Sequence, residues 1–462
     1  MKQKVYFIIV VLLLNVYSSC DQKFEESLPD EVPGLKKAVI SENEANMVPG
    51  EMLVKYKAGI NEAKKRAILA KIEGKQKEKI VTRMMERRGD KEGITLVQVT
   101  GKVKEAVAAL KGDPDIEYAE PNYIYTCDGT SNDVYYTNGS LWGMYGQTTS
   151  PSNPFGSGAS SAWASGHTGS TSVWVGIIDV GYMYSHEDLS ANAGKNPGEI
   201  SGNGIDDDRN GYIDDVYGWD FYNEDNTVFD GVTDDHGTHV AGTIGAKGGN
   251  RKGVAGICWD IRLLNAKFLG DGGGTTANAV RAVDYLTDLK IKQGLNIVAV
   301  NNSWGGGDFS QALYDAIQRA GEQNILYIFA AGNGALNTDV TPMYPASYTC
   351  DNIISVASIN SAGELSYFSN YGNTSVDLAA PGSMIYSTVP RQSRNKIVSS
   401  YASYSGTSMA APHVTGAVAL YASTHPGATA QEIKAAVLES VIPTGSLTGK
   451  CVSGGRLETG KF

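Results

Sequence analysis

Four continuous apolar runs stand in the middle of the chain, and helical segments separate the later ones. The runs are VWVGIIDV (173–180), IRLLNAKFL (261–269), LNIVAVNNSW (295–304) and ILYIFAAG (325–332). Such runs are typical of parallel strands that are buried on both faces. Residues 275–291 and 310–323 have the periodicity of amphipathic helices. This alternation predicts an α/β fold with a doubly wound, mostly parallel sheet.

Two polar residues stand where these runs end. Asp179 closes the first run, and Asn333 directly follows the last. In open α/β sheets the active site lies at the carboxyl ends of the strands. We therefore expect both side chains to belong to a site at this edge of the sheet.

Two glycine-punctuated segments supply a histidine and a serine. HGTHVAGTI (236–244) contains His236, and GTSMAAPHVTG (406–416) contains Ser408. A serine hydroxyl becomes a good nucleophile when an imidazole takes its proton and a carboxylate orients that imidazole. The chain order Asp179, His236, Ser408 is one of the orders in which such triads occur. The pattern predicts acyl transfer.

Both segments resemble the subtilase family nearly residue for residue, and the resemblance extends over residues 119–462. It implies a serine endopeptidase that acts on polypeptides without a catalytic cofactor. His236 is then the general base and later the general acid, oriented by Asp179. Asn333, with the Ser408 N–H, forms the oxyanion hole. An esterase of the α/β-hydrolase kind is disfavoured because its serine precedes its Asp and His.

The resemblance also implies a set of substrate-lining residues. Bare glycine edges allow an extended peptide to add as a strand through its main chain. The acidic residue that attracts a basic side chain is absent after Asn333, where Gly334 and Ala335 follow. We expect a broad or apolar preference. The expected lining residues are Gly272, Gly273, Gly274, Ser303, Trp304, Gly305 and Gly306.

Val180 departs from the family pattern, which has Ser or Thr after the catalytic aspartate. Valine has no hydroxyl to bond the carboxylate, and one lost hydrogen bond to a charged group costs about 1.5–3 kcal/mol. Two consequences are possible for catalysis. Neighbouring groups compensate for the lost bond, or the site is catalytically impaired and the protein is a surface binding protein. A zinc site at His236 and His239 is disfavoured because no acidic residue stands between them, and His239 is expected to pack.

The segment NGIDDDRNGYIDD (203–215) indicates a structural calcium site. Asp206, Asp208 and Asn210 occupy positions 1, 3 and 5 of a calcium loop, and Asp214 occupies position 9. Position 12 is Tyr217 rather than the bidentate glutamate. A solvated acidic turn is the alternative.

Residues 48–126 predict a small α+β, ferredoxin-like domain. Strands are expected at 50–57, 94–100 and 116–125, with helices at 61–72 and 103–110. It resembles the inhibitory propeptide of subtilisin-like proteases, particularly in AEPNY (119–123). The resemblance implies a zymogen whose propeptide is an intramolecular inhibitor, with self-cleavage between residues 122 and 133. Residues 127–163 are expected to be a linker and the start of the mature enzyme, and 164–462 the catalytic domain.

The first 20 residues indicate export. Met1 begins a short charged stretch, and an apolar run at 5–14 follows that is too short to span a bilayer. The end of this segment resembles a bacterial lipobox, which would attach a lipid to Cys20 and hold the protein on a membrane. Ordinary signal cleavage is the alternative. Residues 21–47 are acidic and polar and are expected to form a flexible tether.

The charge is uneven along the chain. Residues 51–111 contain 16 Lys or Arg and 8 Asp or Glu, a net charge of about +8. Because the whole chain has a net charge of −11, the other residues together carry about −19. The acidic total disfavours a nucleic-acid partner, and we expect a monomer. The remaining cysteines form either two disulfides, in one of three connectivities, or free buried thiols; these are Cys127, Cys258, Cys350 and Cys451.

Overall fold

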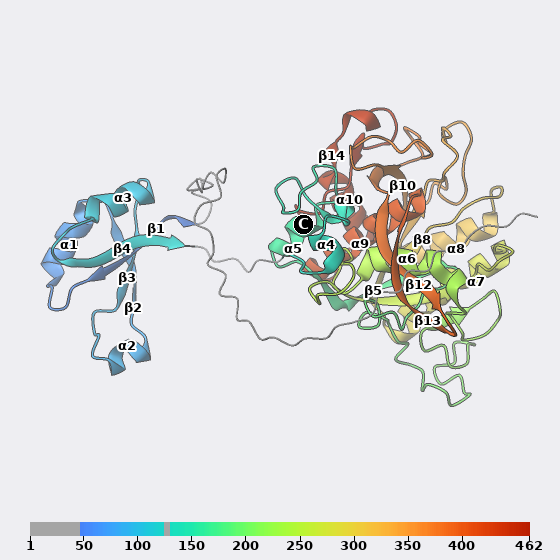
Figure 1. The fold of residues 1–462 in the computed structure, drawn as a ribbon, viewed down its shortest axis with the longest axis horizontal. Helices are drawn as coiled ribbons and strands as arrows, with labels where there is room; N and C mark the ends of the chain where they lie inside the picture. Colours follow the sequence, from blue (N-terminus) through green and yellow to red (C-terminus); the bar gives the residue numbers. More distant parts are fainter. Residues whose placement is uncertain (1–46, 124–129) are drawn as a thin grey trace, which may run out of the picture. The chain divides into compact units, whose positions relative to one another are not determined.

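The computed structural model describes residues 47–123 and 130–462, and the chain divides into two units, Met1–Tyr125 and Thr126–Phe462 (Figure 1). The predicted signal segment with Cys20 lies outside the described residues, as do most of the tether and Cys127. Each unit has a core of its own.

The first unit is a four-stranded antiparallel sheet with helices. Its sheet order is β2-β3-β1-β4, so β3 separates β1 from β2, and β1 separates β3 from β4. This is the split βαβ arrangement of ferredoxin-like domains. The elements are β1 (Met47–Tyr56), α1 (Glu62–Ala70), β2 (Lys75–Ile80), α2 (Arg83–Arg87), β3 (Ile94–Gln98), α3 (Val103–Leu110) and β4 (Ile116–Tyr123).

The small α+β domain is confirmed, but the expectation of three strands is wrong. The additional strand is β2, with the sequence KQKEKI. Its residues are exposed except for the half-buried Ile80, and it lies at the edge of the sheet. A charged edge strand needs no buried face, so it carries no apolar alternation that a sequence pattern could reveal.

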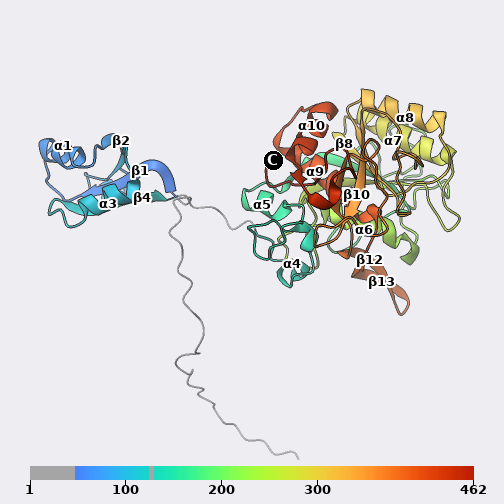
Figure 2. The ribbon, with the colours of Figure 1, turned by 90° about the horizontal axis from the view of Figure 1, so that it is seen from above.

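The second unit contains the predicted doubly wound sheet (Figure 2). None of the helices in the described ranges combines the length and apolarity that a membrane span requires. The elements are α4 (Val134–Thr137), η2 (Trp142–Met144), α5 (Ala159–Ala164), β5 (Gly169–Asp179), β6 (Gly218–Asp220), η3 (Val232–Asp234), α6 (Asp235–Gly245), β7 (Asp260–Lys267), α7 (Thr276–Gln293), β8 (Ile297–Asn302), α8 (Gln311–Glu322), β9 (Leu326–Ala330), β10 (Ile353–Ile359), β11 (Leu378–Pro381), β12 (Ile385–Ser393), β13 (Lys396–Tyr404), α9 (Thr407–Thr424), α10 (Ala430–Ser440), β14 (Ile442–Pro443), η4 (Gly445–Leu447) and β15 (Gly455–Arg456).

The sheet order is β14-β15-β11-β10-β9-β8-β5-β7-β6. Every neighbouring pair is parallel except β14 with β15. The long hairpin of β12 and β13 stands apart from this sheet (Figures 1 and 2). The predicted fold class is therefore confirmed.

Alternate side chains of the strands fill two separate cores. On β9, Leu326 and Ile328 belong to the core beneath α6 and α9, whereas Tyr327 and Phe329 belong to the core beneath α7 and α8. Both faces are thus covered by helices, which explains why the strands appear in the sequence as continuous apolar runs. The strands, including their carboxyl ends, are therefore packed between these two layers of helices.

Residues 130–163 contain more structure than the predicted linker. Tyr136 and Trp163 are fully buried in the core on the α6 and α9 side, and Trp163 Nε1 donates to the Ile257 carbonyl over 2.9 Å. The buried aromatic residues are what indicates structure in this part of the chain. They were overlooked because Ser, Asn and Gly residues surround them in the sequence.

The three cysteines within the described residues are free and buried. Burial raises the pKa of the Cys258 thiol above its ordinary range and that of Cys350 to about 11. The finding supports free buried thiols over two disulfides.

Candidate active site

Asp179 and His236 are in direct contact. His236 Nδ1 lies 2.8 Å from Asp179 Oδ1. The carboxylate is fully buried at the end of β5, whereas the imidazole, in the first turn of α6, is 32% exposed. The aspartate therefore fixes Nδ1, and Nε2 is left free of this contact.

Glycines permit this close approach. A Cβ on Gly237 would lie 2.1 Å from the Gly181 carbonyl oxygen, so the turn after β5 and the first turn of α6 could not meet with any side chain there. Gly181 itself has φ +101° and faces the Val228 carbonyl, which a Cβ would approach to 2.4 Å. The glycine that follows His236 in the motif is thus a steric requirement of the pair.

Two effects act on the ionisation of His236. Burial lowers its pKa, but the charge of Asp179 and the hydrogen bond to Nδ1 outweigh burial and raise the pKa above the ordinary value. His239, one turn further on, behaves differently. Burial lowers its pKa to about 3, its Nε2 donates to the Ile385 carbonyl over 2.9 Å, and its ring stacks on Tyr404. His239 is therefore a neutral packing residue, as expected.

Val180 contributes through its backbone. Its N–H donates to Asp179 Oδ1 over 2.8 Å, while the buried Oδ2 atom has no hydrogen-bond partner among the described residues. Asp179 Oδ1 thus accepts two hydrogen bonds, one of them from the residue whose side chain departs from the family pattern.

Ser408 lies in the first turn of α9, which packs beside α6 on the same face of the sheet. Pro412 lies inside this helix and has no N–H, so the carbonyl of Ser408, four residues earlier, lacks its intrahelical donor. Ser303 Oγ supplies that bond over 2.8 Å, and Ser408 Oγ in turn donates to the Ser303 carbonyl over 3.2 Å. The serine hydroxyl is therefore bonded to Ser303 rather than to His236, and catalytic hydrogen bonds often tighten only in the complex with substrate.

Asn333 has a fixed side chain. Its Oδ1 accepts hydrogen bonds from the N–H and the hydroxyl of Thr407, at 2.8 and 2.9 Å. This leaves Nδ2 free to donate elsewhere. The position that a Cβ would take on Gly406 lies 3.6 Å from Asn333 Nδ2 and 3.6 Å from the backbone nitrogen of Ser408. Both nitrogens therefore lie near the same point beside Gly406.

A cavity of about 400 Å³ gathers most of the predicted substrate-lining residues. Gly273, Gly274, Trp304, Gly305 and Gly306 line it, whereas Gly272 and Ser303 do not. The sequence interpretation missed its apolar walls, because nothing in the sequence pattern distinguishes these residues from residues of the core. They are Phe268, Leu269, Ala279, Leu313, Tyr344 and Tyr348.

The acidic loop differs from the predicted ligand set. Asp206 and Asp208 come together with Glu199, each offering an oxygen within 4.8 Å of the others. Asp214 instead accepts hydrogen bonds from the N–H groups of Gly202, Asn203 and Gly204.

Asn210 donates to Asp208 and Asp215 through its side-chain amide. Glu199 was missed because it lies seven residues before Asp206, the first position of the calcium loop, where no loop spacing points to it. The described residues thus form an acidic group able to hold a metal ion.

A model of the subtilase family matches residues 170–454, which is more than half of the chain and includes Asp179, His236, Asn333 and Ser408. The chain belongs to the subtilase family. A second model, of the fervidolysin N-terminal prodomain, matches residues 34–122 of this subtilase.

Relatives of this subtilase are proteases. The thermophilic serine proteinase of Bacillus sp. strain AK1 is 32% identical over 385 residues, which is 83% of this chain and 80% of that protein. The extracellular protease of Xanthomonas campestris pv. campestris is 35% identical over 360 residues, 75% of this chain and 59% of that protein.

A solved structure of a protease from Pseudoalteromonas arctica has a TM-score of 0.56 and 28% identity, and the match covers 72% of this chain and 98% of that one. This subtilase is a subtilisin-like serine proteinase with an N-terminal prodomain.

Proposed function

We propose that this subtilase hydrolyses peptide bonds through Asp179, His236 and Ser408, with Asn333 as an oxyanion donor. The 2.8 Å contact between His236 Nδ1 and the buried Asp179 carries the proposal. It holds the imidazole in the tautomer whose Nε2 is an acceptor, as proton transfer from Ser408 requires.

The reaction follows from these positions. Ser408 Oγ attacks the substrate carbonyl carbon while its proton passes to His236 Nε2. The developing oxyanion accepts hydrogen bonds from Asn333 Nδ2 and the Ser408 N–H, and one such donor contributes about 2.7–4 kcal/mol. His236 then protonates the leaving amine, and water repeats the sequence on the acyl-enzyme. The glycine edges at 272–274 and 305–306 support main-chain binding of extended polypeptides.

We further propose that the protein is a zymogen that cleaves itself after the prodomain. Ser408→Ala should leave the purified precursor uncut, because the nucleophile is absent. The matched control is the same precursor mixed with wild-type enzyme, which should cut it and so show that the bond is accessible. Processing of purified Ser408→Ala at the same bond on its own would exclude self-cleavage.

A fluorophosphonate probe tests the triad separately from processing. Only an activated serine reacts with it, so the wild-type protein should be labelled at Ser408. Absence of labelling in folded wild-type protein would favour the surface binding protein instead.

Export, and attachment through a lipid on Cys20, are further parts of the proposal. The name of the Xanthomonas relative, an extracellular protease, supports an exported enzyme. Mass spectrometry of the mature N-terminus distinguishes a lipidated Cys20 from ordinary signal cleavage.

We also propose that Glu199, Asp206 and Asp208 hold a structural calcium ion. Calcium prefers oxygen ligands, and the three carboxylates supply them at mutual distances within 4.8 Å. The ion would neutralise this acidic loop and has no part in the acyl transfer.

A further inference from the structure

A buried lysine stands beside the Asp179–His236 pair without belonging to it. Lys267 ends β7, pairs with Asp179 in the parallel register, and has a side chain that is 4% exposed. Paired residues on neighbouring strands project to the same face. Lys267 and Asp179 therefore both approach α6 from the sheet.

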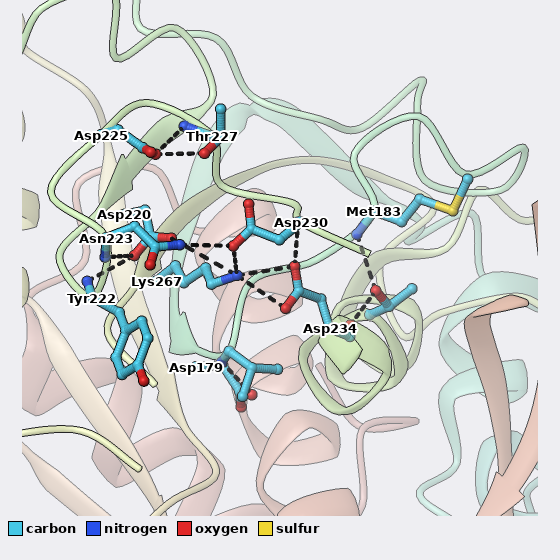
Figure 3. A network of polar contacts seen from close by, with 12 residues as sticks. Asp179, Met183, Asp220, Tyr222, Asn223, Asp225, Thr227, Asp230, Asp234 and Lys267 are labelled. Atoms are coloured by element: carbon cyan, nitrogen blue, oxygen red, sulfur yellow. Dashed lines mark hydrogen bonds and ion pairs between the residues drawn. The ribbon is translucent and has the colours of Figure 1, made fainter. Parts of the chain in front are cut away.

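The lysine is surrounded by carboxylates (Figure 3). Its Nζ lies 2.5 Å from Asp230, 3.0 Å from Asp234 and 3.8 Å from Asp220. Burial lowers the pKa of Lys267, but the hydrogen bonds and charges of Asp230 and Asp234 outweigh it and raise the pKa. These contacts thus favour the charged ammonium. Burying these acids without it would leave them uncompensated.

Asp234 connects this lysine to the helix that carries His236. It is the residue directly before α6, and both its carboxylate oxygens lie within 3.1 Å of Lys267 Nζ. Its carbonyl accepts from Thr238 Oγ1 over 2.7 Å inside the first turn. The start of α6 is therefore attached to the sheet at two points, Asp234 to Lys267 and His236 to Asp179.

We propose that Lys267 is a positioning residue for His236: through Asp234 it fixes the first turn of α6, so that the imidazole stays on Asp179 and faces the nucleophile. Thr238 in the same turn is also bonded to Met183 and Thr388. The two attachments at Asp234 and His236 are the ones that reach the strand ends, and they fix the rotation of the turn relative to Asp179. This inference rests on the proposed role of His236 as general base.

Two aspartates on the same lysine provide a matched pair of variants. Asp234→Asn and Asp230→Asn each remove one carboxylate from Lys267, but only Asp234 adjoins α6. Asp230 precedes it by four residues and is 34% exposed. Lys267→Met removes the cation from both.

Each variant is produced as the full-length protein and is then matured on immobilised wild-type enzyme. The experiment compares kcat and KM of the matured proteins. Active sites are counted by exhaustive fluorophosphonate labelling, so misfolded protein does not enter the values. We expect Asp234→Asn and Lys267→Met to lower kcat per labelled site by about 100-fold, with KM changed by less than about threefold, because a small misplacement of a catalytic group acts on the chemical step. Asp230→Asn should retain kcat within about threefold.

Equal kcat in Asp234→Asn and Asp230→Asn would overturn the proposal, as would a rise in KM with kcat unchanged. If Asp234→Asn and Lys267→Met are both unfolded by circular dichroism while Asp230→Asn is folded and labelled, Lys267 serves folding and the proposal fails. Ser408→Ala, measured in parallel, keeps the two hypotheses apart, because an active Ser408→Ala would refute the triad itself.

Discussion

At the scale of single residues, the proposed role of His236 as general base makes activity depend on the ionisation of its imidazole. Asp179 raises the pKa of His236 despite burial. In the proposed mechanism the neutral imidazole is the base, so activity should rise with pH through that raised pKa.

Asp179→Asn removes the charge and leaves burial, so the acid limb of kcat/KM should move to lower pH while kcat falls by about 10⁴-fold. The pH profile of kcat/KM checks this expectation. His425→Gln, a change at an exposed histidine, should leave the limb in place. An acid limb that is unmoved in Asp179→Asn would mean that another group controls it.

The sequence predicted some residues of the site and not others for a physical reason. Asp179, His236 and Ser408 stand in motifs where backbone geometry restricts the neighbours, as the contact of Gly237 with Gly181 illustrates. Lys267 is a single charge at the end of an apolar run, and its partners are 33 to 47 residues earlier in the chain. No local pattern encodes such a pairing. The role of Val180 also needed the structure, because it acts through a backbone N–H.

At the scale of elements, periodicity predicted what is buried. The strands β5, β7, β8 and β9 and the helices α7 and α8 were found from apolar patterns. The strand β2 escaped because its edge position leaves its charged residues in solvent. The helix α9 adds a subtler case, since its internal Pro412 is offset by a serine from another segment.

The loop at 199–214 provides a prediction about metal binding. If calcium binds only the folded state, a concentration of 100 times the dissociation constant adds about 2.7 kcal/mol of stability. This should raise Tm by about 5 °C.

Thermal unfolding of the Ser408→Ala precursor with calcium and with chelator measures the effect without self-digestion. Glu199→Gln should abolish the rise. Asp214→Asn should lower Tm in both conditions but keep the rise, because Asp214 binds backbone N–H groups. A calcium response that survives Glu199→Gln would place the ion elsewhere.

At the scale of the whole molecule, the two units carry opposite charge. The first unit, residues 1–125, has a net charge of +2, to which the stretch 51–111 contributes +8, and the second unit, residues 126–462, has a net charge of −13. If the released prodomain inhibits the protease, the attraction should weaken as salt shortens the Debye length from about 30 Å at 0.01 M to about 3 Å at 1 M.

Progress curves recorded directly after maturation should therefore show a lag before full activity that shortens with added NaCl. Enzyme freed from its prodomain should show no lag at any salt concentration. A lag of constant length would indicate that apolar contacts dominate the inhibition.

The exchange of hydrogen bonds between Ser303 and Ser408 has a consequence for how this enzyme can vary. The strand edge that is expected to hold the substrate and the helix that carries the nucleophile are joined by the same two residues. A change at Ser303 intended to alter which peptides are cut would also free the Ser408 carbonyl and disturb the attacking hydroxyl. We therefore expect selectivity to be easier to redesign through the aromatic walls of the cavity, because a change at Ser303 would alter turnover as well.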